Sequence, residues 1–198
     1  MTDEQASKFA IEAFKNQALK VVKETFKTID KHLQMLSQKQ EYALVYDLWK
    51  RKNYTSLTIE ELKNIKSLDL GYTEIVDLPF EFMYLESLES LNLSGNNLQK
   101  VPECVWELKN LKELSLGTFV YGGNPLYAIS PKIKNLQKLE ILDVRLCKNL
   151  KTLPQEILQL PNLCYIRLSE KELYKSDIIQ KVKNETDICP FYEDDFFS

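Results

Sequence analysis

The sequence predicts an α/β solenoid, in which short strand-containing units stack between helical caps. Three observations predict this fold class. Leucines recur at a near-constant interval, because Leu68, Leu91 and Leu114 are 23 residues apart and the equivalent Leu142 and Ile166 follow at 28 and 24. Each of these positions lies in the same short apolar pattern. Residues 3–52 lack that pattern and are instead apolar at intervals of mostly three and four, as on one face of a helix.

The repeated pattern is LxxLxL, and it occurs five times, at residues 65–70, 88–93, 111–116, 139–144 and 163–168. The second half of a unit carries proline and further apolar positions, as in Leu153-Pro154-x-x-Ile157-x-x-Leu160. Over residues 57–169 the chain therefore resembles the leucine-rich-repeat family, in the variety with 23-residue repeats whose second half reads LPxxIxxL. The resemblance implies a curved parallel sheet of about five repeats.

The strand of each unit directs the two leucines of LxL inward, and a single unit cannot bury them alone. Stacking closes the core, and the outward strand positions then form a concave face. In the family the turn after the strand usually holds an Asn that bonds the neighbouring backbone. That position is Asn96 in the second unit and Cys147 in the fourth, whereas the first unit has Thr73 and the third is interrupted. We call the series of such turn side chains, each bonded to the backbone of the neighbouring unit, the polar ladder. The resemblance leaves its continuity in doubt at the third unit.

The ends of the stack require covers, because a terminal repeat would otherwise expose the apolar core. We expect residues 1–56 to form an N-terminal cap that consists of two helices in a hairpin. The apolar face of the first helix contains Phe9, Ala13, Val22, Phe26, Ile29, Leu33 and Leu36. The second helix contains Tyr42, Val45, Leu48 and Trp49. Thr58 and Glu61 have the spacing of a capping box. We expect the solenoid at 57–169 and, at 170–198, a short cap helix over 176–184 followed by an acidic and aromatic tail, 189–198. The tail either docks onto a partner or packs over the last repeat, and packing is the simpler account.

Composition narrows the classes of function. The net charge of −3 does not favour nucleic acid, and no segment is apolar enough to span a membrane. The four cysteines lack CxxC spacing and His32 is the sole histidine, so a metal site is not predicted. No catalytic set or phosphate-binding loop is visible, which predicts a non-enzyme without a cofactor. The polar start without an apolar run favours a cytoplasmic protein, with an exported effector lacking a visible signal as the alternative.

Candidate binding residues lie where the repeat does not dictate the residue type. The outward strand positions and their neighbours predict a concave face that includes Asp69, Asn92, Glu113, Ile141, Asp143, Arg145, Tyr165 and Arg167. The third unit also carries an insertion of about six residues within 117–127, which contains Phe119, Tyr121 and Tyr127. The inserted loop either overhangs the concave face as one wall of a binding site, or folds back to fill a gap in the stack.

These observations predict a protein–protein interaction module, a monomer that binds another protein through the concave face and the inserted loop. Two alternatives rest on resemblance. Some bacterial effectors combine a helical cap with similar repeats, which suggests an effector or the repeat fragment of a ubiquitin ligase without its catalytic domain. Intracellular proteins with similar repeats suggest a regulatory scaffold for a small GTPase or phosphatase.

Overall fold

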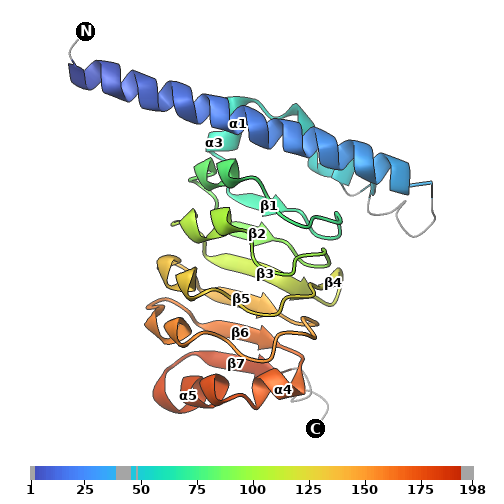
Figure 1. Ribbon diagram of the computed structural model, residues 1–198, viewed down its shortest axis with the longest axis vertical. Coiled ribbons are helices and arrows are strands. Elements are labelled where there is room, and N and C mark those ends of the chain that lie inside the picture. Colours follow the sequence, from blue (N-terminus) through green and yellow to red (C-terminus); the bar gives the residue numbers. More distant parts are fainter. Residues whose placement is uncertain (1–2, 39–45, 48, 193–198) are drawn as a thin grey trace.

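The computed structural model describes residues 3–38, 46–47 and 49–192, and it is a stack of strands beneath one long helix (Figure 1). Five short strands pair in parallel in the order β1, β2, β3, β5, β6. Their register aligns Leu68, Leu91, Leu114, Leu142 and Ile166. The strands are β1 Ser67–Asp69, β2 Ser90–Asn92, β3 Glu113–Thr118, β5 Ile141–Val144 and β6 Tyr165–Leu168. The predicted fold class is confirmed.

Short 3-10 helices on the return side close each repeat, at Phe80–Tyr84, Glu103–Glu107, Pro131–Asn135 and Gln155–Gln159. Three of the four follow directly on the proline of the LPxxIxxL pattern, because proline fixes the backbone angle for a turn start. In the fourth, Pro131–Asn135, Ser130 takes the place of that proline and its side chain accepts from the N–H of Lys132. The apolar residues of these helices, such as Phe82, Val105, Ile133 and Ile157, are buried against the inward leucines of the strands. Both halves of a repeat therefore supply one continuous core.

The N-terminal cap consists mainly of helix α1, Asp3–Leu36, which at 1.5 Å per residue is about 51 Å long. Its buried face carries Leu19, Val22, Phe26, Ile29 and Leu33. Residues 46–47 and 49–52 are also helical, and helix α3, Ile59–Lys63, begins at the predicted Thr58–Glu61 capping box. Tyr42, Val45 and Leu48 lie outside the described residues. The cap covers the first repeat through the C-terminal two thirds of α1.

The N-terminal third of α1 differs from the expectation. Phe9 and Ala13, which we expected on the packed face, are exposed, and the Phe9 side chain is 72% accessible. The reason is geometric, because α1 is longer than the repeat it covers and its first turns project beyond the stack (Figure 1). A helical period identifies apolar positions but not how far the surface beneath them extends.

The C-terminal end also differs from the expectation. Helices α4, Lys171–Tyr174, and α5, Asp177–Glu185, cover the last repeat, with Ile178, Ile179 and Val182 buried as expected. The start of the expected tail, however, forms strand β7, Cys189–Tyr192, which pairs in parallel with β6. Strand pairing therefore continues past residue 169. Residues 193–198 lie outside the described residues.

Among the residues that the structure describes, β7 is the last strand of the sheet, and its sequence disfavours pairing with a further strand. The N–H of Cys189 donates to the carbonyl of Cys164 at 2.8 Å, so the backbone of Cys189 faces β6. Alternate residues of a strand direct their backbone groups to opposite edges, which places the backbone of Pro190 on the open side. Because proline has no N–H, the edge lacks a donor there and is a poor template for a further strand.

Candidate functional site

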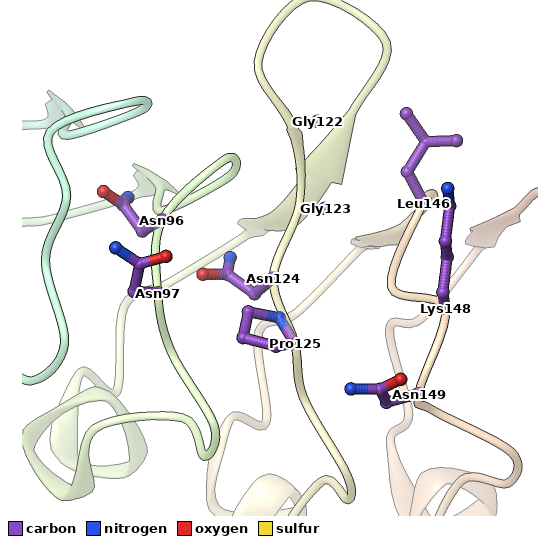
Figure 2. Close-up of a pocket in the computed structure, with 9 residues that line it drawn as sticks. All are labelled: Asn96, Asn97, Gly122, Gly123, Asn124, Pro125, Leu146, Lys148 and Asn149. Carbon is purple, nitrogen blue, oxygen red and sulfur yellow. The ribbon is translucent and has the colours of Figure 1, made fainter.

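The turns after the strands form a continuous polar ladder, which the sequence had left in doubt at the third repeat. Asn96 donates to the carbonyls of Leu70 and Leu93 at 2.8 and 2.9 Å. Asn124 occupies the same place in the third repeat and donates to Leu93 and Leu116 at 2.8 and 2.7 Å (Figure 2). The Thr73 hydroxyl and the Cys147 thiol serve the first and fourth repeats, donating to Leu70 at 2.7 Å and to Leu116 at 3.5 Å. The ladder therefore runs unbroken through four repeats.

The alignment of the ladder residues Asn96 and Asn124 locates the inserted residues directly before Asn124. Leu93 is followed by Asn96 after three residues, whereas Leu116 is followed by Asn124 after eight. The five additional residues form a hairpin, in which the end of β3 pairs antiparallel with β4, Gly122–Gly123. Because a hairpin returns the chain to where it left, the ladder resumes at Asn124 without displacing the fourth repeat. The insertion is therefore five residues and not about six, because Ser130 precedes its 3-10 helix six residues after Asn124, just as Pro102 does six residues after Asn96.

One side of this hairpin folds back over the first two repeats. A Cβ added to Gly71 would lie 2.6 Å from the Tyr121 ring, and one added to Gly95 would lie 1.8 Å from the Tyr121 backbone oxygen. The Tyr121 hydroxyl donates to Asp69 at 3.3 Å. Burial, and then the charge of Asp69, raise the pKa of Tyr121, so the phenol is a protonated donor at neutral pH. Tyr121 therefore anchors the hairpin to the N-terminal half of the concave face.

The other side of the hairpin contacts the fourth repeat. The Phe119 ring lies over the guanidinium of Arg145, 4.5 Å from ring centroid to Cζ. Arg145 in turn binds Asp143 through Nε at 2.9 Å and Nη2 at 2.6 Å. We expected Asp143 to be presented on the concave face, but its side chain is fully buried. The strand alternation places Asp143 outward as expected, and Arg145 then folds across it and removes it from solvent.

In the N-terminal half of the concave face, the polar side chains form hydrogen bonds and ion pairs with one another. Asp69 pairs with Lys52 at 2.7 Å and accepts from the Asn92 amide at 2.9 Å. Asn92 accepts from the Ser94 hydroxyl at 2.6 Å, and Ser94 lies 3.2 Å from the Thr118 hydroxyl at the base of the hairpin. Of the predicted binding residues, Asp69, Asn92 and Tyr121 therefore have structural partners.

The C-terminal half of the concave face remains accessible. Tyr165 is 49% exposed, and the half-buried Ile141 and Arg167 lie beside it in the strand register. Strand β7 adds Cys189 next to Tyr165 and Phe191 next to Arg167. The hairpin tip borders this half with Phe119, 44% exposed, and Val120, 83% exposed. We define these seven residues as the open patch.

Sequence reasoning missed Cys189 and Phe191, because residues 187–192 do not follow LxxLxL. The available signal was the interval, since Pro190 follows Ile166 by the same 24 residues that separate Ile166 from Leu142. Tyr127 was assigned to the site but lies elsewhere. It follows the ladder position by three residues, as Gln99 does, and its N–H donates to the Gln99 carbonyl at 3.3 Å on the return side.

The charged groups of the concave face are mutually compensated. Arg167 lies 3.9 Å from Glu113 and 3.7 Å from Asp143, Arg145 binds Asp143, and Lys52 binds Asp69. Among the residues that the structure describes, three carboxylates thus face three cations. The face presents little net charge, so its complementarity to a ligand depends on shape, apolar contact and neutral hydrogen bonds.

The thiols divide into two classes. Burial raises the pKa of the Cys104 and Cys147 thiols to about 12, whereas Cys164 and Cys189 are exposed. Because the thiolate is the nucleophile, we expect iodoacetamide at pH 8 to label Cys164 and Cys189 in the folded protein and to spare Cys104 and Cys147 until denaturant is added. Peptide mapping by mass spectrometry checks this, and rapid native labelling of Cys147 would contradict its assignment to the ladder.

Neither metal binding nor membrane insertion has a candidate in the part of the chain that the structure describes. Among those residues, no three His, Cys, Asp or Glu side chains come together as a metal site. Within the same ranges, no helix has both the length and the apolar character needed to cross a bilayer.

Comparisons with known proteins agree with this architecture. Residues 63–118 match the family model described as Leucine rich repeat. A putative RNA-binding protein of Caenorhabditis elegans is 30% identical over 176 residues, which are 81% of this chain and 23% of the relative. The mouse leucine-rich repeat serine/threonine-protein kinase 1 is 31% identical over 134 residues, 62% of this chain and 6% of the kinase. The chain thus spans less than a quarter of the length of either relative.

Among solved structures, a leucine-rich-repeat protein of Leptospira interrogans is 29% identical and superposes with a TM-score of 0.52, covering 67% of this chain and 38% of that one. The family match, the five in-register repeats and the ladder that joins them lead to one assignment. The chain is a leucine-rich-repeat protein.

Proposed function

We propose that this protein is a non-enzymatic, cytoplasmic interaction module that binds another polypeptide through the open patch, with the hairpin tip as one wall. One observation carries the proposal. The side of the hairpin that faces the N-terminal repeats is anchored by Tyr121, whereas Phe119 and Val120 remain exposed, with the Phe119 ring over Arg145 of the fourth repeat. Tyrosine and arginine residues in such positions are frequent energetic centres of protein interfaces. The open patch provides both, in Tyr165 and Arg167.

The charge balance of the concave face supports a polypeptide over a nucleic acid. The Caenorhabditis relative is named as a putative RNA-binding protein. Binding to RNA draws on unpaired basic side chains and weakens steeply with salt. On the concave face of this chain Lys52, Arg145 and Arg167 each lie beside a carboxylate. We therefore infer that association through the open patch depends only weakly on ionic strength.

The protein acts as a monomer in this proposal. The sheet edge at β7 lacks a donor at Pro190, and the other end of the stack is covered by α1. Neither end of the sheet therefore favours strand addition by a second copy. The proposed partner approaches the face of the sheet and not its edges.

Affinity capture from the native host with three baits tests the proposal. The first bait is the wild-type protein, the second carries Tyr165→Ala with Arg167→Ala, and the third replaces residues 117–123 by Ser-Gly. This replacement copies Ser94-Gly95 and keeps Asn124 as the next residue, so the ladder is preserved. We expect a partner that is retained by the wild type, weakened about tenfold or more in both variants, and largely retained at about 0.5 M salt.

The matched control is Tyr127→Ala, which removes a tyrosine of the third repeat that is more exposed than Tyr165 and lies away from the open patch. It should retain the partner fully. Folding of every bait is verified by circular dichroism and thermal unfolding. Equal recovery by the wild type and both patch variants would exclude the open patch, and loss of the captured species at 0.5 M salt or on RNase treatment would favour a nucleic acid.

A further inference from the structure

A second surface feature, a recess, also involves the hairpin but shares no residue with the open patch. This recess of about 520 Å³ is lined by residues from three successive repeats (Figure 2). The lining residues are Asn96, Asn97, Gly122, Gly123, Asn124, Pro125, Leu146, Lys148 and Asn149. Pro125 lies centrally, with Asn97 on the side of the second repeat and Lys148 and Asn149 on the side of the fourth. The recess depends on the insertion, because the returning strand β4 forms its upper part.

The polar groups of the recess fall into two kinds. The amides of Asn96 and Asn124 are buried and fully used by the backbone ladder. The amides of Asn97 and Asn149 and the ammonium of Lys148 are exposed, and within the described ranges they form no side-chain hydrogen bond or ion pair. The recess therefore presents three donors without a protein acceptor.

The recess carries positive charge only. None of its lining residues is acidic, and Lys148 is its single charged group. Lys148 differs in this respect from Lys132, which pairs with Glu103 at 2.7 Å, and from Lys151, which pairs with Glu172 at 2.5 Å. The side chains of Pro125 and Leu146 add an apolar surface beside the donors. A cation, two amide donors and a short apolar wall match an oxyanion on an aliphatic stem.

We propose that this recess is a second binding site, which takes a carboxylate on a short aliphatic chain. Lys148 supplies the charge, Asn97 and Asn149 supply neutral hydrogen bonds, and Pro125 and Leu146 contact the methylene groups. Both the acidic side chain of a polypeptide and a free dicarboxylate carry this chemistry. The site is separate from the open patch. None of the patch residues lines the recess, whose residues belong to β4 and to the turns that follow β2, β4 and β5.

Titration by NMR tests the site, with the side-chain NH2 signals of Asn97 and Asn149 as reporters. The probes are N-acetylglutamate N-methylamide, as a mimic of an acidic side chain in a polypeptide, and glutarate, as a free dicarboxylate. The capped glutamine analogue has the same shape without the charge. We expect at least one acid to shift both Asn signals saturably and the glutamine analogue to bind roughly tenfold more weakly or not at all. Preference between the two acids identifies the source of the carboxylate.

Lys148→Gln should lower the affinity for the binding acid by roughly tenfold, since it removes the charge-assisted hydrogen bond while keeping an uncharged polar side chain at this position. The matched control is Lys100→Gln, an exposed lysine outside the recess, which should leave the affinity unchanged. The proposal is overturned if neither acid shifts the Asn signals, if the glutamine analogue binds as well, or if Lys148→Gln and Lys100→Gln behave alike. Tighter binding of inorganic phosphate than of either acid would also overturn the assignment to carboxylates.

Discussion

Asn96→Ala should destabilise the protein by about 3–5 kcal/mol in urea unfolding, because it leaves two buried N–H groups without an acceptor. The Asn96 carbonyl oxygen accepts from the backbone N–H of Thr73 at 2.9 Å and of Ile75 at 3.0 Å. The carbonyls that lose its amide are less affected. Leu70 still accepts from the Thr73 hydroxyl, and Leu93 from Asn124. Most of the cost therefore comes from the orphaned donors.

The adjacent residue provides the control for this prediction. Asn97 is exposed, and its side chain forms no hydrogen bond within residues 3–38, 46–47 and 49–192, so Asn97→Ala should change the free energy of unfolding by less than about 0.5 kcal/mol. The two variants delete the same chemical group one residue apart. A loss below about 1 kcal/mol for Asn96→Ala would show that the ladder does not stabilise the stack.

Phe26→Ala should destabilise the protein by about 3–5 kcal/mol, since it removes the central side chain between the cap and the first repeat. The Phe26 ring is fully buried, with its centroid 6.2 Å from Trp49, 5.3 Å from Tyr54 and 5.9 Å from Phe82. These partners come from three different segments, which limits how far the site can collapse around the cavity. Urea unfolding followed by circular dichroism and by tryptophan fluorescence measures the loss, and the fluorescence reports on the environment of Trp49 and Trp106.

Phe9→Ala is the matched control on the same helix. Because the Phe9 side chain is 72% exposed on the projecting turns of α1, its removal should leave stability within about 0.5 kcal/mol of the wild type. A large loss for Phe9→Ala would mean that the first turns of α1 pack against the protein in solution. Similar values for the two variants would contradict the placement of the cap on the first repeat.

Much of the architecture follows from local spacing. The LxxLxL pattern determined the five strands and their register, because two leucines per strand can be buried only if equivalent residues of successive repeats stack in line. Thr58 and Glu61 determined the start of α3 for a similarly local reason, since both bonds of a capping box join residues three positions apart. Ile178, Ile179 and Val182 were predictable as one apolar helix face.

The candidate site was predictable only in part. The alternation of side chains along a strand identified Tyr165, Arg167 and Ile141 as outward residues. It could not show that Arg145 folds over Asp143, because that choice depends on the shape of the neighbouring hairpin and on Phe119 above the guanidinium. Equally, β7 has none of the leucine spacing, and only its pairing with β6 places Cys189 and Phe191 beside the predicted residues.

The sequence by itself therefore determined the repeat, its register, the start of α3, the apolar face of α5 and the location of the insertion, since each is encoded in residues a few positions apart. Only the tertiary structure decided that the insertion is a hairpin, that the ladder resumes at Asn124, and that Tyr121 reaches Asp69, 52 residues earlier in the chain. The physical reason is that these contacts join separate repeats. Their energies depend on which surfaces the stacking brings together, and the spacing within one repeat carries no information about that.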